Sequence, residues 1–109
     1  MNSEAIFTVR DVAKDKSGAS IFVGCPDNGT SVHVGDKFTL RYEVPRTLDD
    51  VLNERPMAAP INSCAVALTV TAIDSMRRSV DVLTPGVTGA LYLSGEGMEH
   101  VCKGTFLKT

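Results

Sequence analysis

The side chains best suited to chemistry are three cysteines and two histidines, spread widely over 109 residues. They are Cys25, Cys64, Cys102, His33 and His100. Structural zinc sites usually contain a close ligand pair such as Cys-x₂₋₄-Cys, and the sequence has none. Cys25 with a histidine is the only combination that suggests nucleophilic catalysis, but a cysteine directly before Pro26 is more typical of a turn. We therefore expect no metal, no cofactor and no catalysis, with a small Cys25-dependent enzyme as the remaining catalytic alternative.

Two pairs of adjacent charged residues could also form a site. Asp49-Asp50 could be paired carboxylates, but adjacent helical residues point in different directions, so the first turn of a helix explains them. Arg77-Arg78 is the strongest basic pair; it suits either a solvated turn or a contact with ribosomal RNA or an acidic protein. The other cations that folding could bring to this pair are Arg41, Arg46, Lys103 and Lys108.

Charge and composition exclude several classes of protein. The formal net charge is −2, with 7 basic against 9 acidic side chains in residues 1–63 and 4 against 4 in residues 64–109. This balance does not favour a protein that holds polyanions by charge alone. The sequence opens without a signal-peptide pattern, its apolar stretches are too short to span a bilayer, and three widely spaced cysteines are not a disulfide framework. We expect a cytoplasmic protein with no membrane contact.

Short apolar alternations, separated by glycine- and proline-rich turns, dominate the chain. The expected strands cover residues 7–12, 20–24, 38–44, 65–73, 79–83, 90–93 and 105–107. Turns are expected at Gly18, Asn28-Gly29, Pro85-Gly86 and Gly95-Glu96-Gly97. The pattern predicts an all-β fold in one domain, residues 1–109: a small closed or nearly closed antiparallel β-barrel, because closure hides the strand edges.

Residues 44–63 lack the strand-like alternation of the rest of the chain and are interpreted as an insertion in the barrel. Thr47 is a suitable N-cap, and the apolar spacing that follows predicts a short helix over about residues 48–54, ended by Pro56. Residues 55–62 are expected to be an extended linker. The insertion is either a cap on the core or a surface that binds a protein partner. The residues that would form such a surface are Asp49, Asp50, Glu54, Met57 and Ile61.

The order of several motifs resembles domain 2 of the translational GTPases, the barrel of elongation factor Tu and its relatives. In the first half these are Phe7-x-Val9-x-Asp11-Val12, Gly18-Ala19-Ser20-Ile21-Phe22-Val23-Gly24 and Val34-Gly35-Asp36-x-Phe38-x-Leu40. In the second half they are Ala72-Ile73-Asp74-Ser75-Met76-Arg77-Arg78-Ser79-Val80, Gly89-Ala90-Leu91-Tyr92-Leu93-Ser94-Gly95 and Gly104-Thr105-Phe106-Leu107. The resemblance covers the chain except about residues 44–63 and implies a domain 2-like barrel.

The same resemblance implies a barrel standing alone, without the GTPase. In the family, GTPase activity belongs to a separate domain with a phosphate loop, and no Gly-x-x-x-x-Gly-Lys-Ser/Thr sequence occurs here. The family's barrel helps hold the aminoacyl end of tRNA at a Glu-Asp-Val-Phe motif, which aligns with Arg10-Asp11-Val12-Ala13, and at a threonine, which aligns with Ser20. Because Arg10 reverses a charge and Ala13 lacks the aromatic ring, we do not expect aminoacyl-tRNA binding.

Two binding hypotheses follow, since fold alone does not determine function. The first is a non-catalytic module that acts through protein–protein contacts, for example a small inhibitor or immunity-type protein. The second is a translation-associated accessory module that contacts the ribosome, tRNA or a translation factor through Arg77 and Arg78. Nucleic acid is expected only at that local patch.

Overall fold

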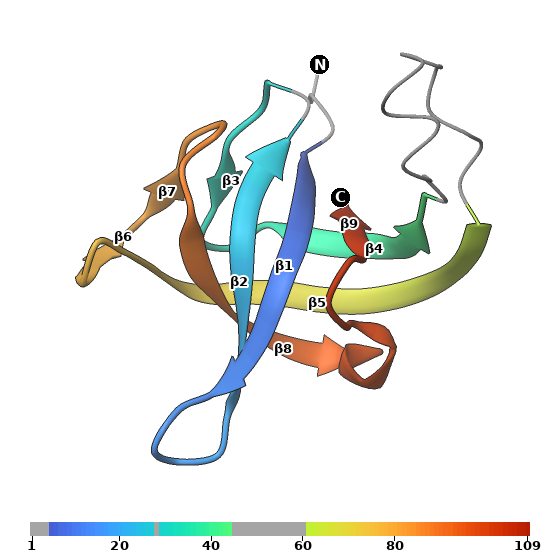
Figure 1. The fold of residues 1–109 in the computed structure, drawn as a ribbon, viewed down its shortest axis with the longest axis horizontal. Helices are drawn as coiled ribbons and strands as arrows, with labels where there is room; N and C mark the ends of the chain where they lie inside the picture. Colours follow the sequence, from blue (N-terminus) through green and yellow to red (C-terminus); the bar gives the residue numbers. More distant parts are fainter. Residues whose placement is uncertain (1–4, 28, 45–60) are drawn as a thin grey trace, which may run out of the picture.

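Six strands close into an antiparallel barrel in the computed structural model, which describes residues 5–27, 29–44 and 61–109 (Figure 1). The strands are β1 (Ile6–Lys14), β2 (Ser20–Asp27), β3 (Val32–His33), β4 (Lys37–Glu43), β5 (Ile61–Ser75), β6 (Arg78–Val80), β7 (Val82–Leu83), β8 (Gly89–Glu96) and β9 (Phe106–Lys108). The hydrogen-bonded order is β4-β9-β1-β2-β8-β5, and β5 pairs with β4 to complete the ring. The predicted closed antiparallel barrel is therefore confirmed.

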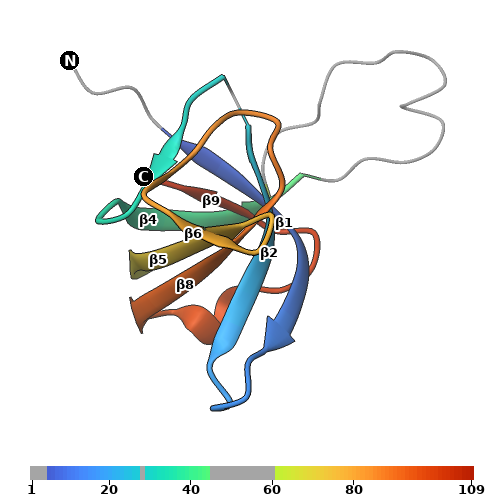
Figure 2. The same ribbon diagram turned by 90° about the vertical axis from the view of Figure 1, so that its left-hand side faces the viewer.

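The long strand β5 connects most parts of the molecule. It pairs with β8 along one edge and with β4 and then β6 along the other, and it runs across the whole width of Figure 1. Figure 2 shows β9, β4, β5 and β8 side by side in one wall, with β1 and β2 crossing them at an angle. Because β5 extends beyond the barrel at its C-terminal end, the β5–β6 hairpin projects from it.

Alternating apolar residues fill the barrel interior. Phe7 and Val9 of β1 and Leu68 and Val70 of β5 are almost completely buried, as period-2 alternation requires of inward-facing positions. In β5 the buried positions shift phase after Val70, where a bulge adds one residue before Ala72 pairs with β8. The next buried side chain is therefore Ile73 rather than a residue two positions after Val70.

Two smaller elements extend the same core beyond the ring. Strands β3 and β7 pair as a separate ladder and add the buried Val32 and Leu83. After β8, a single turn of 3-10 helix, η1 (Met98–His100), leads to the buried Val101, and Met98 packs against the core. Figure 1 shows the β3–β7 ladder and η1 on opposite sides of the molecule.

Several strand boundaries differ from those predicted. Strand β2 continues through Cys25 and Pro26, where a loop was expected, because Pro26 lies beyond the stretch that pairs with β8 and its missing N–H interrupts no bond there. The segment 79–83 is divided into β6 and β7, and β8 runs on through Gly95 to Glu96. The predicted helix over 48–54 lies outside the described residues, as does Asn28 of the expected Asn28-Gly29 turn.

Candidate functional site

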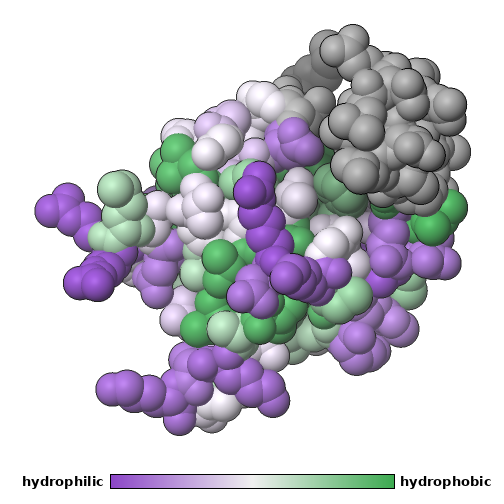
Figure 3. All heavy atoms as spheres, viewed as in Figure 1, coloured by the Kyte–Doolittle hydropathy of each residue, from purple (hydrophilic) through white to green (hydrophobic). Residues whose placement is uncertain are grey.

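The hairpin tip, defined here as Met76, Arg77 and Arg78 between β5 and β6, is the most prominent exposed feature. Ser75 pairs with Arg78, so Met76 and Arg77 form a two-residue turn. Both have positive φ, 52° and 65°, although neither is glycine. The Met76 side chain is 89% exposed, and both arginines are exposed. Figure 3 shows strongly hydrophilic surface projecting at this end of the molecule.

The β1–β2 loop also carries basic side chains, but its geometry has a local structural explanation. The Asp15 carboxylate accepts hydrogen bonds from the Ser17 hydroxyl (2.7 Å), the Ser17 amide (2.9 Å) and the Ala19 amide (3.0 Å). The Ser17 hydroxyl, followed by these amides, lowers the pKa of Asp15. Gly18 supplies the positive φ of 89° that the turn requires. In this loop a glycine occupies the position with positive φ, so the turn explains its residue types. At the hairpin tip, two non-glycine residues have positive φ, and the turn does not explain them.

Residues 44–63 contribute little to the described surface. Asp49, Asp50, Glu54 and Met57 lie outside the described residues. Ile61 is 44% exposed and begins β5, so the expected linker over 55–62 is wrong at its last two positions. Those two residues are strand because Ile61 pairs with Glu43 across the β4–β5 ladder.

Arg41 forms a cluster that the sequence did not reveal. Its guanidinium donates from Nε to the His100 carbonyl (2.5 Å) and from Nη1 to the Asn62 carbonyl (2.9 Å). It also lies 3.1 Å from the Glu43 carboxylate and 3.8 Å from the Cys102 sulfur. Its side chain is only 12% exposed. Arg41 was one of the cations that folding could have brought to the Arg77-Arg78 pair; in the structure its guanidinium makes these contacts instead.

Glu43 and Asn62 complete this cluster at the start of β5. The Asn62 amide donates to Glu43 at 2.8 Å, and Asn62 itself has a positive φ of 53°. The Asn62 hydrogen bond, with the Arg41 charge as a further cause, lowers the pKa of Glu43. The Arg41 cluster therefore links β4, the first residues of β5 and the segment that follows η1.

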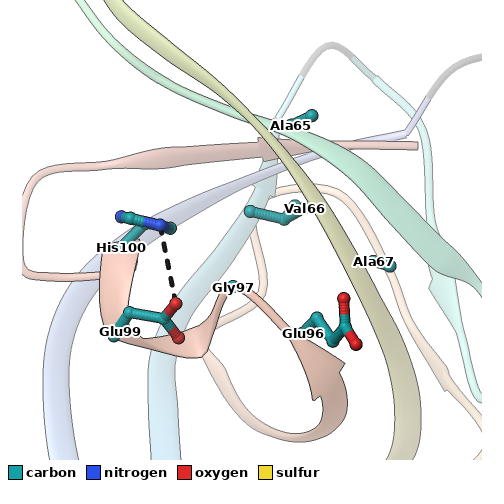
Figure 4. A pocket seen from close by; sticks show the side chains of 7 residues that line it. All are labelled: Ala65, Val66, Ala67, Glu96, Gly97, Glu99 and His100. Atoms are coloured by element: carbon teal, nitrogen blue, oxygen red, sulfur yellow. Dashed lines mark ion pairs between the residues drawn. The ribbon is translucent and has the colours of Figure 1, made fainter.

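A pocket of about 370 Å³ lies between β5 and η1 (Figure 4). Its lining residues are Ala65, Val66, Ala67, Glu96, Gly97, Glu99 and His100. Glu99 and His100 form an ion pair whenever the imidazole is protonated, with 3.5 Å between Nε2 and Oε1. From the sequence, Gly95-Glu96-Gly97 was expected only to be a turn. An acidic residue between two glycines was the one feature of the sequence that could have indicated this pocket.

The cysteines and histidines do not gather. Cys25 lies within β2 opposite Thr8, and Cys102 is exposed. His33 belongs to the β3 turn, where its amide donates to Asp36. His100 is the last residue of η1, and its imidazole lies beside Glu99. Within the described parts of the chain, no three metal-capable side chains come together and no hydrogen bond joins a thiol to an imidazole.

The residues aligned with the aminoacyl-end motif lie on the projecting part of β1. Strand β1 has a bulge between Val9 and Asp11, so Arg10 is the extra residue, and the strand is exposed from Arg10 onward. Asp11 accepts a hydrogen bond from the Val12 amide (2.9 Å). The charge reversal at Arg10 and the small side chain at Ala13 therefore occur on solvent-exposed surface.

Comparison with known proteins defines the class of fold. No protein-family model matches the chain, and no curated protein matches it in sequence. Among solved structures, the chain is similar to translation elongation factor SelB from Methanococcus maripaludis in its apo form, with a TM-score of 0.63 and 16% identity over 100% of this chain. The match spans 19% of the length of that SelB chain. The predicted resemblance to a translation-factor barrel is thus confirmed at the level of fold.

The helical content of the described residues was compared with the length that a membrane span requires. In residues 5–27, 29–44 and 61–109, no helix is long and apolar enough to cross a bilayer. Two surface features remain to be explained, the hairpin tip at the C-terminal end of β5 and the η1 pocket near its N-terminal end.

Proposed function

We propose that this chain is a non-catalytic, translation-associated binding module that docks through the hairpin tip onto the phosphate backbone of structured RNA. One observation carries the proposal, namely the residue types in the Met76-Arg77 turn. Positive φ at both central positions favours Asn-Gly, and a left-handed conformation costs a non-glycine residue roughly 1–2 kcal/mol. Local stability therefore does not explain these two residues, and a contact made by their side chains does.

The chemistry of the tip suits phosphate. Arg77 and Arg78 are exposed, and a guanidinium binds a phosphate through two parallel hydrogen bonds. Met76 adds a flexible apolar side chain that can pack on a sugar or a base. Because the net charge of the chain is −2, long-range attraction to RNA is weak, so affinity depends on this local contact.

The link to translation and the absence of catalysis are parts of the same proposal. The similarity to SelB supports a translation-associated role, and the scattered thiols and imidazoles give no support to catalysis by Cys25. A cytoplasmic location follows from that role and is also proposed.

Co-sedimentation with purified ribosomes tests the proposal, with Arg77→Gln/Arg78→Gln compared against Lys14→Gln/Lys16→Gln. Each double variant removes two positive charges from an exposed hairpin end, so net charge is matched. We expect the arginine variant to lose about tenfold or more in affinity and to lower the salt-dependence slope by about 2, while the lysine variant changes little. Equal losses in both variants, or no sedimentation of the parent protein, would refute RNA docking by the tip.

A second candidate function is a small inhibitor or immunity-type protein that binds a basic protein. The observations that favour it are the exposed Ile61 and the carboxylates of Glu96 and Glu99 at the η1 pocket. In that case the chain should co-purify in a 1:1 complex with the product of a neighbouring gene, and Ile61→Asp should break the complex. An unaffected complex would exclude Ile61 from the interface.

A further inference from the structure

We infer that the η1 pocket binds an arginine side chain presented by a partner protein. The site is distinct from the hairpin tip: the tip follows the C-terminal end of β5, and the pocket floor is Ala65–Ala67 near its N-terminal end. The inference goes beyond the RNA contact and does not depend on it.

The pocket combines a small apolar floor with charged walls. Ala65, Val66 and Ala67 of β5 form the floor, and the walls come from the end of β8 and from η1. In Figure 4, Glu96 and the Glu99–His100 pair lie on the two sides of Gly97. A volume of about 370 Å³ is at the lower end of the range for ligand sites, which suits one long side chain.

Two glycines build this geometry. Gly95 has a φ of 129°, and a Cβ there would overlap the Ala67 carbonyl. Gly97 has a φ of 100°, and a Cβ there would lie 2.6 Å from Val66 Cγ1. The chain therefore passes over β5 at a closeness that only glycine permits, and this close approach forms the base of the pocket.

The far wall is fixed independently of any ligand. Val101, directly after η1, is 6% exposed and packs in the core, and Met98 packs against the core at the other end of η1. The Arg41 guanidinium holds the His100 carbonyl at 2.5 Å. A site that is already rigid before binding loses less entropy when it is occupied.

Charge complementarity selects a cation. Among the described residues, none forms an ion pair or hydrogen bond with the side-chain carboxylate of Glu96, and the Glu99 carboxylate is neutralised by His100 only when the imidazole is protonated. A metal ion needs several close ligands, and the described residues offer no group of three metal-capable side chains. An organic cation with two or more donors is therefore the better match to carboxylates on both sides of the pocket.

Arginine fits this lining better than lysine. Its guanidinium is planar and weakly hydrated, so it can lie on the apolar Ala65–Ala67 floor while its edges donate to carboxylates. A lysine ammonium is compact and strongly hydrated, and the alanines cannot replace its water. This difference separates arginine from a general attraction of positive charge.

The test is an NMR titration of the ¹⁵N-labelled chain with the blocked tripeptide Gly-Arg-Gly, with Gly-Lys-Gly as the matched probe. We expect arginine-specific shifts at the amides of Ala65–Ala67 and Glu96–His100, with the lysine peptide binding about threefold more weakly or worse. Glu96→Gln/Glu99→Gln should weaken the arginine peptide by about fivefold or more. The control Asp11→Asn/Asp81→Asn, which removes two exposed acids elsewhere, should bind like the parent.

A second variant separates shape from charge. Ala65→Leu keeps every charge, and because Ala65 is exposed on the outer face the barrel should fold normally, but the larger side chain should fill the floor and abolish the shifts. The inference is overturned by equal binding of the two peptides, by unchanged binding in Glu96→Gln/Glu99→Gln, or by no pocket shifts at about 10 mM peptide. Pocket shifts that depend on protein concentration alone and vanish in Arg77→Gln/Arg78→Gln would instead identify a second copy as the occupant.

Discussion

Replacing Arg41 by methionine should destabilise the protein substantially while leaving the apolar part of the side chain in place. The substitution removes the hydrogen bonds to the His100 and Asn62 carbonyls and the charge beside Glu43. Hydrogen bonds from a charged group contribute about 1.5–3 kcal/mol each. The two carbonyls lie near the surface and can partly rehydrate, so we expect a net loss of about 2–4 kcal/mol in the free energy of unfolding.

Urea denaturation followed by far-UV circular dichroism measures this loss, with the m-value expected to stay constant. Arg78→Met is the matched control: the same chemical change at the exposed tip should alter stability by no more than about 0.5 kcal/mol. If Arg41→Met unfolds within about 0.5 kcal/mol of the parent, the guanidinium contacts do not hold the segment after η1, and our account of the Arg41 cluster is wrong.

Three further predictions address the turn, the ladder and the titration. Met76→Asn/Arg77→Gly supplies the residues that the turn favours, so it should raise stability by about 1 kcal/mol in the same urea assay while weakening ribosome binding. Gly24→Ala should lower the free energy of unfolding by about 3 kcal/mol or more, because the new Cβ would overlap the Thr8 carbonyl. Gly104 has a φ of 94° and open space around it, so Gly104→Ala should lower it by only about 1–2 kcal/mol. Similar losses in the two variants would contradict the packing argument. The folded-state pKa of Glu43 is lowered, so the contribution of its carboxylate to stability is complete above the ordinary pKa of 4.5 and is lost as the pH falls through the lowered pKa. Urea midpoints measured from about pH 7 to pH 3 should therefore fall less steeply for Glu43→Gln than for the parent.

Much of the barrel could be predicted from local patterns. Alternating residues such as Phe7 and Val9 mark inward-facing positions, because successive side chains of a strand point to opposite faces. Gly24 ends the strand expected over residues 20–24, and a Cβ added there would overlap the Thr8 carbonyl of the neighbouring strand. The strand ends were less predictable, as at Cys25-Pro26, because where a ladder stops depends on which partner strand continues beside it.

The Arg77-Arg78 pair could be found from sequence, but its backbone geometry could not. The residue types of Met76 and Arg77 do not indicate that both adopt positive φ. The pairing of Ser75 with Arg78 leaves a two-residue turn and imposes that conformation on it. The tertiary structure therefore shows that Arg77 is strained and that both arginines are exposed, and these observations support a contact.

The alternation and the turn glycines could be identified from the sequence because they depend on neighbours along the chain, and they predicted a barrel. Its closure depends on the pairing of β4 with β5. The sequence did not show that Arg41 would be half-buried and Arg77 exposed, since each of them stands beside an apolar residue. Only the closed sheet brings the segment after η1 against β4. The Arg41 guanidinium therefore donates hydrogen bonds to two backbone carbonyls, whereas Arg77 remains exposed. The η1 pocket arises in the same way, since Ala65 and Glu99 are 34 positions apart in the sequence and meet only through the pairing of β5 with β8.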